Sequence, residues 1–140
     1  MAVTHLPVMV QTPETASATW TNADSADTKK TVATAGTNGA KITAIVATSS
    51  DTSDRVAQLW ITRSAVSYLL ASVNIPDLSG FNGTDVTVDL KNSTSLPGLP
   101  VDNDGQTYLF LESGDTLQVS FTTQVTAAKT VYVTTFFANF

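Results

Sequence analysis

The sequence contains no cysteine among its 140 residues, which excludes disulfide bonds, thiolate metal sites and a cysteine nucleophile. Charged residues are also scarce, at 14% of the chain. Seven Lys and Arg against twelve Asp and Glu give a formal net charge of −5, which opposes binding to nucleic acid or to an anionic membrane. Stability must therefore come from packing within the chain or from association with other chains.

Long apolar segments are missing as well. No stretch approaches the roughly 20 apolar residues that cross a bilayer, and the N-terminal residues lack the basic start and apolar block of a secretory signal. We therefore expect a soluble protein with no membrane partner, made in the cytoplasm without a classical export signal.

The residues and motifs of the common catalytic sites are sparse. The single histidine is His5, and neither a G-x-S-x-G elbow nor a glycine-rich nucleotide loop occurs. Nothing in the sequence would orient His5 toward a nucleophile. We expect a protein that is not an enzyme and that uses no cofactor.

What the chain does contain is typical of β-structure. Hydrophobic residues make up 42% of it, enough for one core, and Thr, Ser, Val and Ala dominate. Short β-branched and aromatic runs alternate with Gly, Asn, Asp and Ser. We predict strands at 29–34, 40–49, 55–63, 65–73, 84–90, 107–112, 116–123 and 129–138.

The connections between these runs refine the fold class. Asn38-Gly39 and Ser113-Gly114 predict tight hairpins, whereas residues 74–85 and 92–105 are too long for hairpins. Long connections that cross between two sheets are typical of a jelly roll. We predict an all-β fold, a jelly-roll-like antiparallel β-sandwich with an extended N-terminal arm.

The arm is assigned to residues 1–19 and the single sandwich domain to residues 20–140. Pro7 and Pro13 oppose a central strand, while a short apolar run in the arm needs cover. We predict that the arm contacts a neighbouring chain through four residues: Leu6, Val8, Met9 and Val10.

Several predicted strands are apolar on both faces. In Thr116–Phe121 only one row is apolar, with Leu117, Val119 and Phe121 predicted inward. The predicted strands 55–63, 107–112 and 129–138 carry a second apolar row, which must be covered by a loop or by another subunit. The predicted interface candidates in these strands are Trp60, Tyr108, Phe110 and Phe137.

Two acidic clusters have a chemical and a structural interpretation. Asp102 and Asp104 with Gly105 resemble the middle of a calcium loop, but the closing position holds Leu111 instead of Glu. A simple Asx turn is favoured. Asp51 and Asp54 have the residue types of a glycosidase carboxylate pair, although solvated loop acids are commoner.

The segments Ala18–Asp24, Thr34–Ala47 and Val56–Ile61 resemble a group of small virion proteins encoded by tailed bacteriophages and prophages. The segment Tyr108–Ser120 resembles an aromatic strand, Gly-Asp turn and alternating strand of jelly-roll domains, including trimeric ones. These resemblances imply a non-enzymatic structural protein of the virion.

From this resemblance we expect a capsid decoration (cement) protein that lies on the capsid surface and binds the major capsid protein or another virion protein, as a homotrimer. The same resemblance leaves a neck or tail structural protein open. The alternative of a different class is a receptor- or glycan-binding module of a tail or head fibre, which would use Trp60 or the long loops.

Overall fold

The computed structural model describes residues 12–140, and within this range the chain forms nine strands and no helix. One sheet, sheet A, holds β1 (Thr12–Thr21), β9 (Thr130–Asn139) and β3 (Ala40–Ser49), with β6 (Val88–Asp89) and β7 (Leu109–Leu111) on the outer side of β3. The other, sheet B, holds β2 (Lys30–Thr34), β8 (Thr116–Phe121), β4 (Arg55–Arg63) and β5 (Val66–Ile75). All of the pairs are antiparallel, so the predicted all-β antiparallel sandwich is confirmed.

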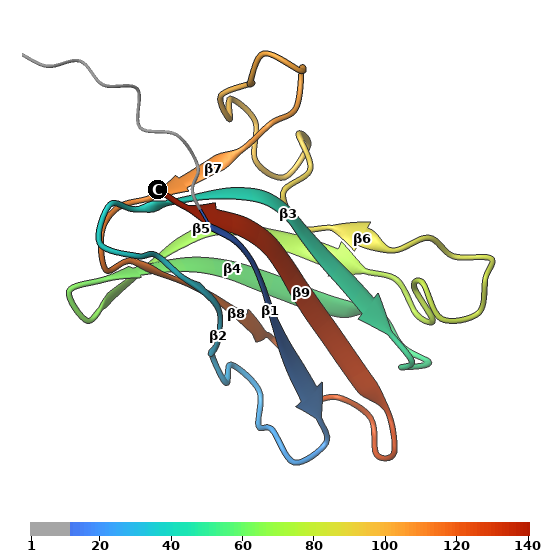
Figure 1. The fold of residues 1–140 in the computed structure, drawn as a ribbon. Coiled ribbons are helices and arrows are strands. Elements are labelled where there is room, and N and C mark those ends of the chain that lie inside the picture. Colours follow the sequence, from blue (N-terminus) through green and yellow to red (C-terminus); the bar gives the residue numbers. More distant parts are fainter. Residues whose placement is uncertain (1–11) are drawn as a thin grey trace, which may run out of the picture.

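The two sheets lie face to face, and the chain changes sheet at most of its connections (Figure 1). Only β4–β5 and β6–β7 follow one another within a sheet. The resulting orders, β1-β9-β3-β6 and β2-β8-β4-β5, mix strands from both halves of the sequence. Of the residues described, no helix is long and apolar enough to cross a membrane.

The core fills the space between the sheets with the inward rows of both. Leu117, Val119 and Phe121 of β8 are buried as predicted, because alternate side chains of a strand point to opposite faces. Trp20 of β1 packs edge-on against Phe121, with ring centroids 5.0 Å apart, and its indole N–H donates to the Thr28 carbonyl.

The prediction of an N-terminal arm is wrong for residues 12–19. Residues 12–19 belong to β1, which pairs with β9 along its whole length from Thr12↔Asn139 to Thr21↔Thr130. Pro13 is accommodated because β1 is an edge strand, where the missing N–H is not needed by a second neighbour. Residues 1–11, with Leu6, Val8, Met9 and Val10, lie outside the described residues, so the predicted contact there stays a prediction.

The Gly-containing turn motifs correctly predicted where the chain turns, but not which strands each turn connects. Gly39 and Gly114 have φ of 89° and 79°, as tight turns require. Each turn leads from one sheet to the other, so the predicted hairpins at these two sites are wrong. The β4–β5 hairpin instead turns at Ser64 and Ala65, two non-glycine residues with φ of 49° and 65°.

Candidate interaction surfaces

The predicted interface residues in the described part of the chain have different exposures. Phe110 of β7 is 51% exposed, and Trp60 and Tyr108 are half-buried. Phe137 is only 5% exposed and packs in the core, so its assignment to an exposed apolar row is wrong. On β9 the inward row consists of Val131, Val133, Thr135 and Phe137, and the side chains between them form the outward row.

The outward row of β9 consists of Tyr132, Thr134 and Phe136, and we call it the β9 outer row. Tyr132 and Phe136 are 47% and 45% exposed. The opposite residues on the neighbouring strands are small and uncharged: Thr15, Ser17 and Thr19 on β1, and Ala44, Val46 and Thr48 on β3. This strip of sheet A therefore offers two aromatic rings among small uncharged side chains.

Two hydrogen bonds tie polar side chains of this strip and its border to the sheet. The Ser17 and Thr134 hydroxyls form a hydrogen bond of 2.9 Å, and the Thr43 hydroxyl donates to the Phe136 carbonyl. A depression of about 350 Å³ lies beside Phe136 and is bordered by the start of β1 at Pro13–Thr15. The apolar surface of the two rings remains partly exposed to solvent.

A second aromatic group lies at β7, which we call the β7 cluster: Tyr108, Phe110 and Phe140. The Tyr108 and Phe110 rings meet edge-on at 4.9 Å, and the centroids of Phe110 and Phe140 are 5.6 Å apart. A depression of about 480 Å³ is lined by Phe110 and Phe140 and by turn residues that include Asn38 and Glu112. The cluster combines apolar rings with polar side chains at its rim.

Charge also borders the β7 cluster. The Lys41 ammonium lies 4.8 Å from the centre of the Tyr108 ring and 3.2 Å from an Asp102 carboxylate oxygen. The other Asp102 oxygen accepts hydrogen bonds from the backbone N–H groups of Asp104 and Gln106. These backbone hydrogen bonds and Lys41 lower the pKa of Asp102. The favoured Asx turn is thus confirmed, and no group of three metal-ligating side chains occurs in residues 12–140.

Trp60 lies on the outer face of sheet B, where the chain supplies its partners. Its indole N–H donates to the Ser120 hydroxyl at 2.9 Å, and the Lys29 ammonium lies 4.3 Å from the centre of its ring. The Ser120 hydroxyl bonds Gln58 in turn, and Thr62 donates to Gln118 at 2.7 Å. Trp60 is therefore a weaker interface candidate than the exposed rings of sheet A.

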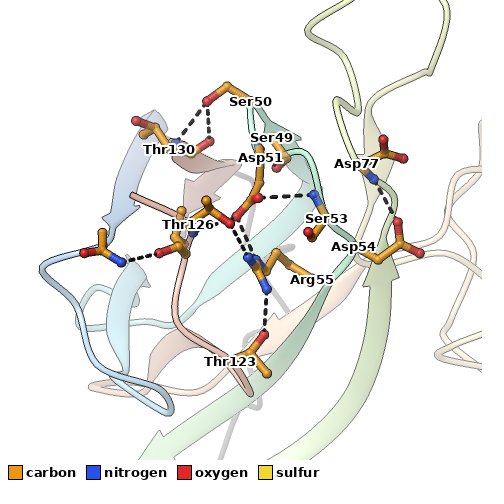
Figure 2. A network of polar contacts seen from close by, with 12 residues as sticks. Ser49, Ser50, Asp51, Ser53, Asp54, Arg55, Asp77, Thr123, Thr126 and Thr130 are labelled. Atoms are coloured by element: carbon orange, nitrogen blue, oxygen red, sulfur yellow. Dashed lines mark hydrogen bonds and ion pairs between the residues drawn. The ribbon is translucent and has the colours of Figure 1, made fainter. Parts of the chain in front are cut away.

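The two acids Asp51 and Asp54 do not act as a pair (Figure 2). Asp51 is 0% exposed, and one of its oxygens accepts from Arg55 Nε at 2.8 Å and from the Thr126 N–H at 3.0 Å. Asp54 accepts a hydrogen bond from the Asp77 N–H, as Figure 2 shows. It also accepts one from the Asn74 amide. Each carboxylate is committed to loop structure.

Burial raises the pKa of Asp51, but hydrogen bonds from Arg55 and Thr126 outweigh this effect, and its pKa falls to about 2. The Arg55 guanidinium also donates to the hydroxyls of Thr123 and Thr126. We call Asp51, Arg55, Thr123 and Thr126 the Asp51 cluster. It ties the β3–β4 loop to the β8–β9 loop across the end of the sandwich (Figure 2).

Sequence reasoning missed Tyr132 and Phe136. The sequence predicts that the C-terminal run is apolar on both faces, but Phe137 lies on its inward row and not on the exposed one. Extending the alternation from Val131 and Val133 places Phe137 inward and Phe136 outward. The alternation that begins at Val131 and Val133 could therefore have identified the β9 outer row from the sequence.

No family model matches the sequence, and no curated protein matches it. Among solved structures the chain is similar to a chain of the capsid asymmetric unit of cyanophage Pam1. The identity is 13% and the TM-score is 0.47, over 99% of this chain and 94% of that chain. Likeness at this level transfers no role to the present chain.

Proposed function

We propose that the protein is a non-enzymatic structural component of a tailed-phage virion, and that it is a capsid decoration protein. The observation that carries the binding role is the β9 outer row, where two half-exposed rings stand on an uncharged strip of sheet A. Exposed apolar surface that one chain cannot cover is typical of a binding surface. The virion setting comes from the sequence resemblance of Ala18–Asp24, Thr34–Ala47 and Val56–Ile61 to phage virion proteins.

The strand order supports this proposal at the level of the fold. We interpret β1-β9-β3-β6 facing β2-β8-β4-β5 as a jelly roll, because most connections cross between the sheets and each sheet pairs early with late strands. Of the two long connections, the one from β5 to β6 crosses as predicted, whereas the prediction is wrong for residues 92–105, which join β6 to β7 within sheet A. Jelly rolls occur in viral capsid and in lectin domains, so the fold is compatible with the proposal and with its alternative.

The proposed partner is the capsid lattice, bound by a homotrimer on the capsid surface. Many identical weak contacts on a repeated lattice add through multivalency, so a small uncharged strip on each copy suffices. The trimer itself comes from the jelly-roll resemblance. The net charge of −5 supports a protein partner over nucleic acid.

The test is co-sedimentation of the purified protein with empty capsids. The expected result is saturable binding by the native chain and loss of binding by Phe136→Thr, because Thr keeps a strand-forming residue while removing the ring. The matched control is Phe81→Thr, since Phe81 is an aromatic residue on the β5–β6 connection that is more exposed than Phe136, at 66% against 45%. Equal binding by both variants would contradict a role for the β9 outer row, and absence of binding by the native chain would contradict the decoration role.

A specific observation favours glycan binding as the second candidate. The β7 cluster offers rings for stacking against a sugar, with Asn38 and Glu112 at the rim as hydrogen-bonding groups. Host-cell polysaccharide should then bind the native chain and not Phe110→Ala. Affinity for polysaccharide without affinity for capsid would replace the first proposal by the second.

A further inference from the structure

A β-sandwich has exposed sheet edges, and three of the edges here carry features that discourage pairing with another strand. At the edge of sheet A, β1 contains Pro13 and Glu14. At the edge of sheet B, β2 has only five residues, begins with Lys30 and has a register shift. On the far side of sheet A, β6 and β7 are two and three residues long. Proline, charge, irregularity and shortness are the usual means of protecting an edge.

The fourth edge is β5, which is as long as β1 but differs from it in composition. Its ten residues, VSYLLASVNI, include no charged residue and no proline. A register shift against β4 at Leu59/Trp60 is its one irregularity. At its start Val66, Tyr68 and Leu69 are 50%, 55% and 48% exposed.

The free backbone groups of β5 can be assigned from its partner strand. The Val56 carbonyl accepts from the Thr122 N–H on the β8 side, so the Val56 backbone points away from β5. Its partner Asn74 therefore points its N–H and C=O away from β4, and the antiparallel alternation places Ser72 likewise. In residues 12–140 no backbone hydrogen bond reaches β5 from beyond β4.

We propose that β5 pairs antiparallel with β5 of a second copy across a two-fold axis, joining two four-stranded sheets into one. The free N–H and C=O groups of an antiparallel edge complement those of an identical strand turned by 180°. Because β5 has no charge, self-pairing places no like charges opposite one another. Because β5 carries no charge, its edge has no electrostatic means of selecting a partner strand of different sequence.

The size of the contact indicates a weak dimer. A ten-residue strand is roughly 33 Å long, and an edge of a two-layer sandwich is on the order of 15 Å deep, so that both copies together bury on the order of 1,000 Å². This area is near the lower limit for a specific interface. The pairing is independent of the proposed virion role and uses a different surface from the β9 outer row.

Analytical ultracentrifugation of the full chain across a range of concentrations tests the pairing. Leu69→Lys puts a charge on the edge of each copy, and the expected result is a sedimenting mass half that of the native chain. The matched control Val86→Lys, at a residue 82% exposed on the β5–β6 connection, should keep the native mass. Equal masses for the native chain and Leu69→Lys would overturn the proposal.

Ser72→Pro provides a second variant that spares the hydrogen bonds to β4. It removes an N–H that points away from β4, so the fold should persist, which circular dichroism checks. The expected mass is again half the native mass, and the native mass would overturn the proposal even if Leu69→Lys did not fold. Because no capsid is present in these measurements, failure of capsid binding leaves their outcome unchanged.

Discussion

The Asp51 cluster and the β9 outer row differ in burial and in whether the chain supplies partners for their side chains. In the cluster a fully buried carboxylate finds its donors within the chain, from Arg55, Ser53 and Thr126. On β9 the rings of Tyr132 and Phe136 remain nearly half exposed, and small side chains surround them. The side chains of the Asp51 cluster thus find their partners within the chain, whereas the rings of the β9 outer row remain partly exposed to solvent.

This difference separates stability from association. A buried charged group that loses its partner costs free energy because the remaining charge is stranded without solvent. A half-exposed ring on the outside of a sheet contributes less to folding than a core ring, because nearly half of its surface stays in water in the folded state. Substitutions in the two regions should therefore change different measurements.

The largest effect is expected for Asp51→Ala. It leaves the Arg55 guanidinium without its carboxylate and the N–H groups of Ser53 and Thr126 without their acceptor. We expect a loss of about 3 to 5 kcal/mol in the free energy of unfolding. Urea unfolding followed by fluorescence measures it, and Asp54→Ala is the control, since Asp54 is an exposed loop acid. Similar losses for both variants would show that burial of Asp51 is not the cause.

Acid should weaken the same cluster with a smaller effect. The pKa of Asp51 is about 2 in the folded chain and 3.8 without its partners, so its contribution is complete above pH 4 and is lost as the pH falls toward 2. The contribution is about 2 kcal/mol. The pKa values of Asp24 and Asp115 are also lowered, by hydrogen bonds from Lys30 and Arg63 respectively, which act in the same direction. Thermal midpoints measured from pH 7 to pH 2 should fall most steeply below pH 4, and less steeply in Asp51→Asn.

Trp60 tests the comparison on the outer face of sheet B, where the chain also supplies its own partners. Trp60→Phe removes the hydrogen bond to Ser120 and reduces the ring surface beneath Lys29. We expect a loss of about 1 kcal/mol in the free energy of unfolding, with the sedimenting mass unchanged. A change of mass without a change of stability would return Trp60 to the interface.

The sequence predicted the elements whose signal is local. Leu117, Val119 and Phe121 alternate with polar residues, so the inward row of β8 follows from a period of two. β1 was missed because Thr, Ser and Ala in residues 12–19 carry little apolar signal, and Pro13 argues against a strand unless its edge position is known. That position depends on β9, more than a hundred residues away.

The candidate surfaces were predicted only in outline for the same reason. The sequence identified strands apolar on both faces, but the inward row depends on which sheet faces which. Trp60 meets Ser120 only because β8 pairs with β4, and it meets Lys29 only because β2, which Lys29 precedes, pairs with the other side of β8. The Asp51 cluster similarly joins Asp51 to Thr126, which are 75 residues apart.

The smallest effect on stability is expected for the β9 outer row. In the double variant Tyr132→Thr/Phe136→Thr, Thr replaces two half-exposed rings and keeps the strand propensity, so the free energy of unfolding should fall by about 1 kcal/mol or less. The inward neighbours Val131, Val133 and Phe137 stay in the core. Because this row is the proposed capsid-binding surface, the double variant should lose co-sedimentation with empty capsids while its sedimenting mass stays that of the native chain. A large loss of stability would show instead that the exposed rings support the sheet within one chain.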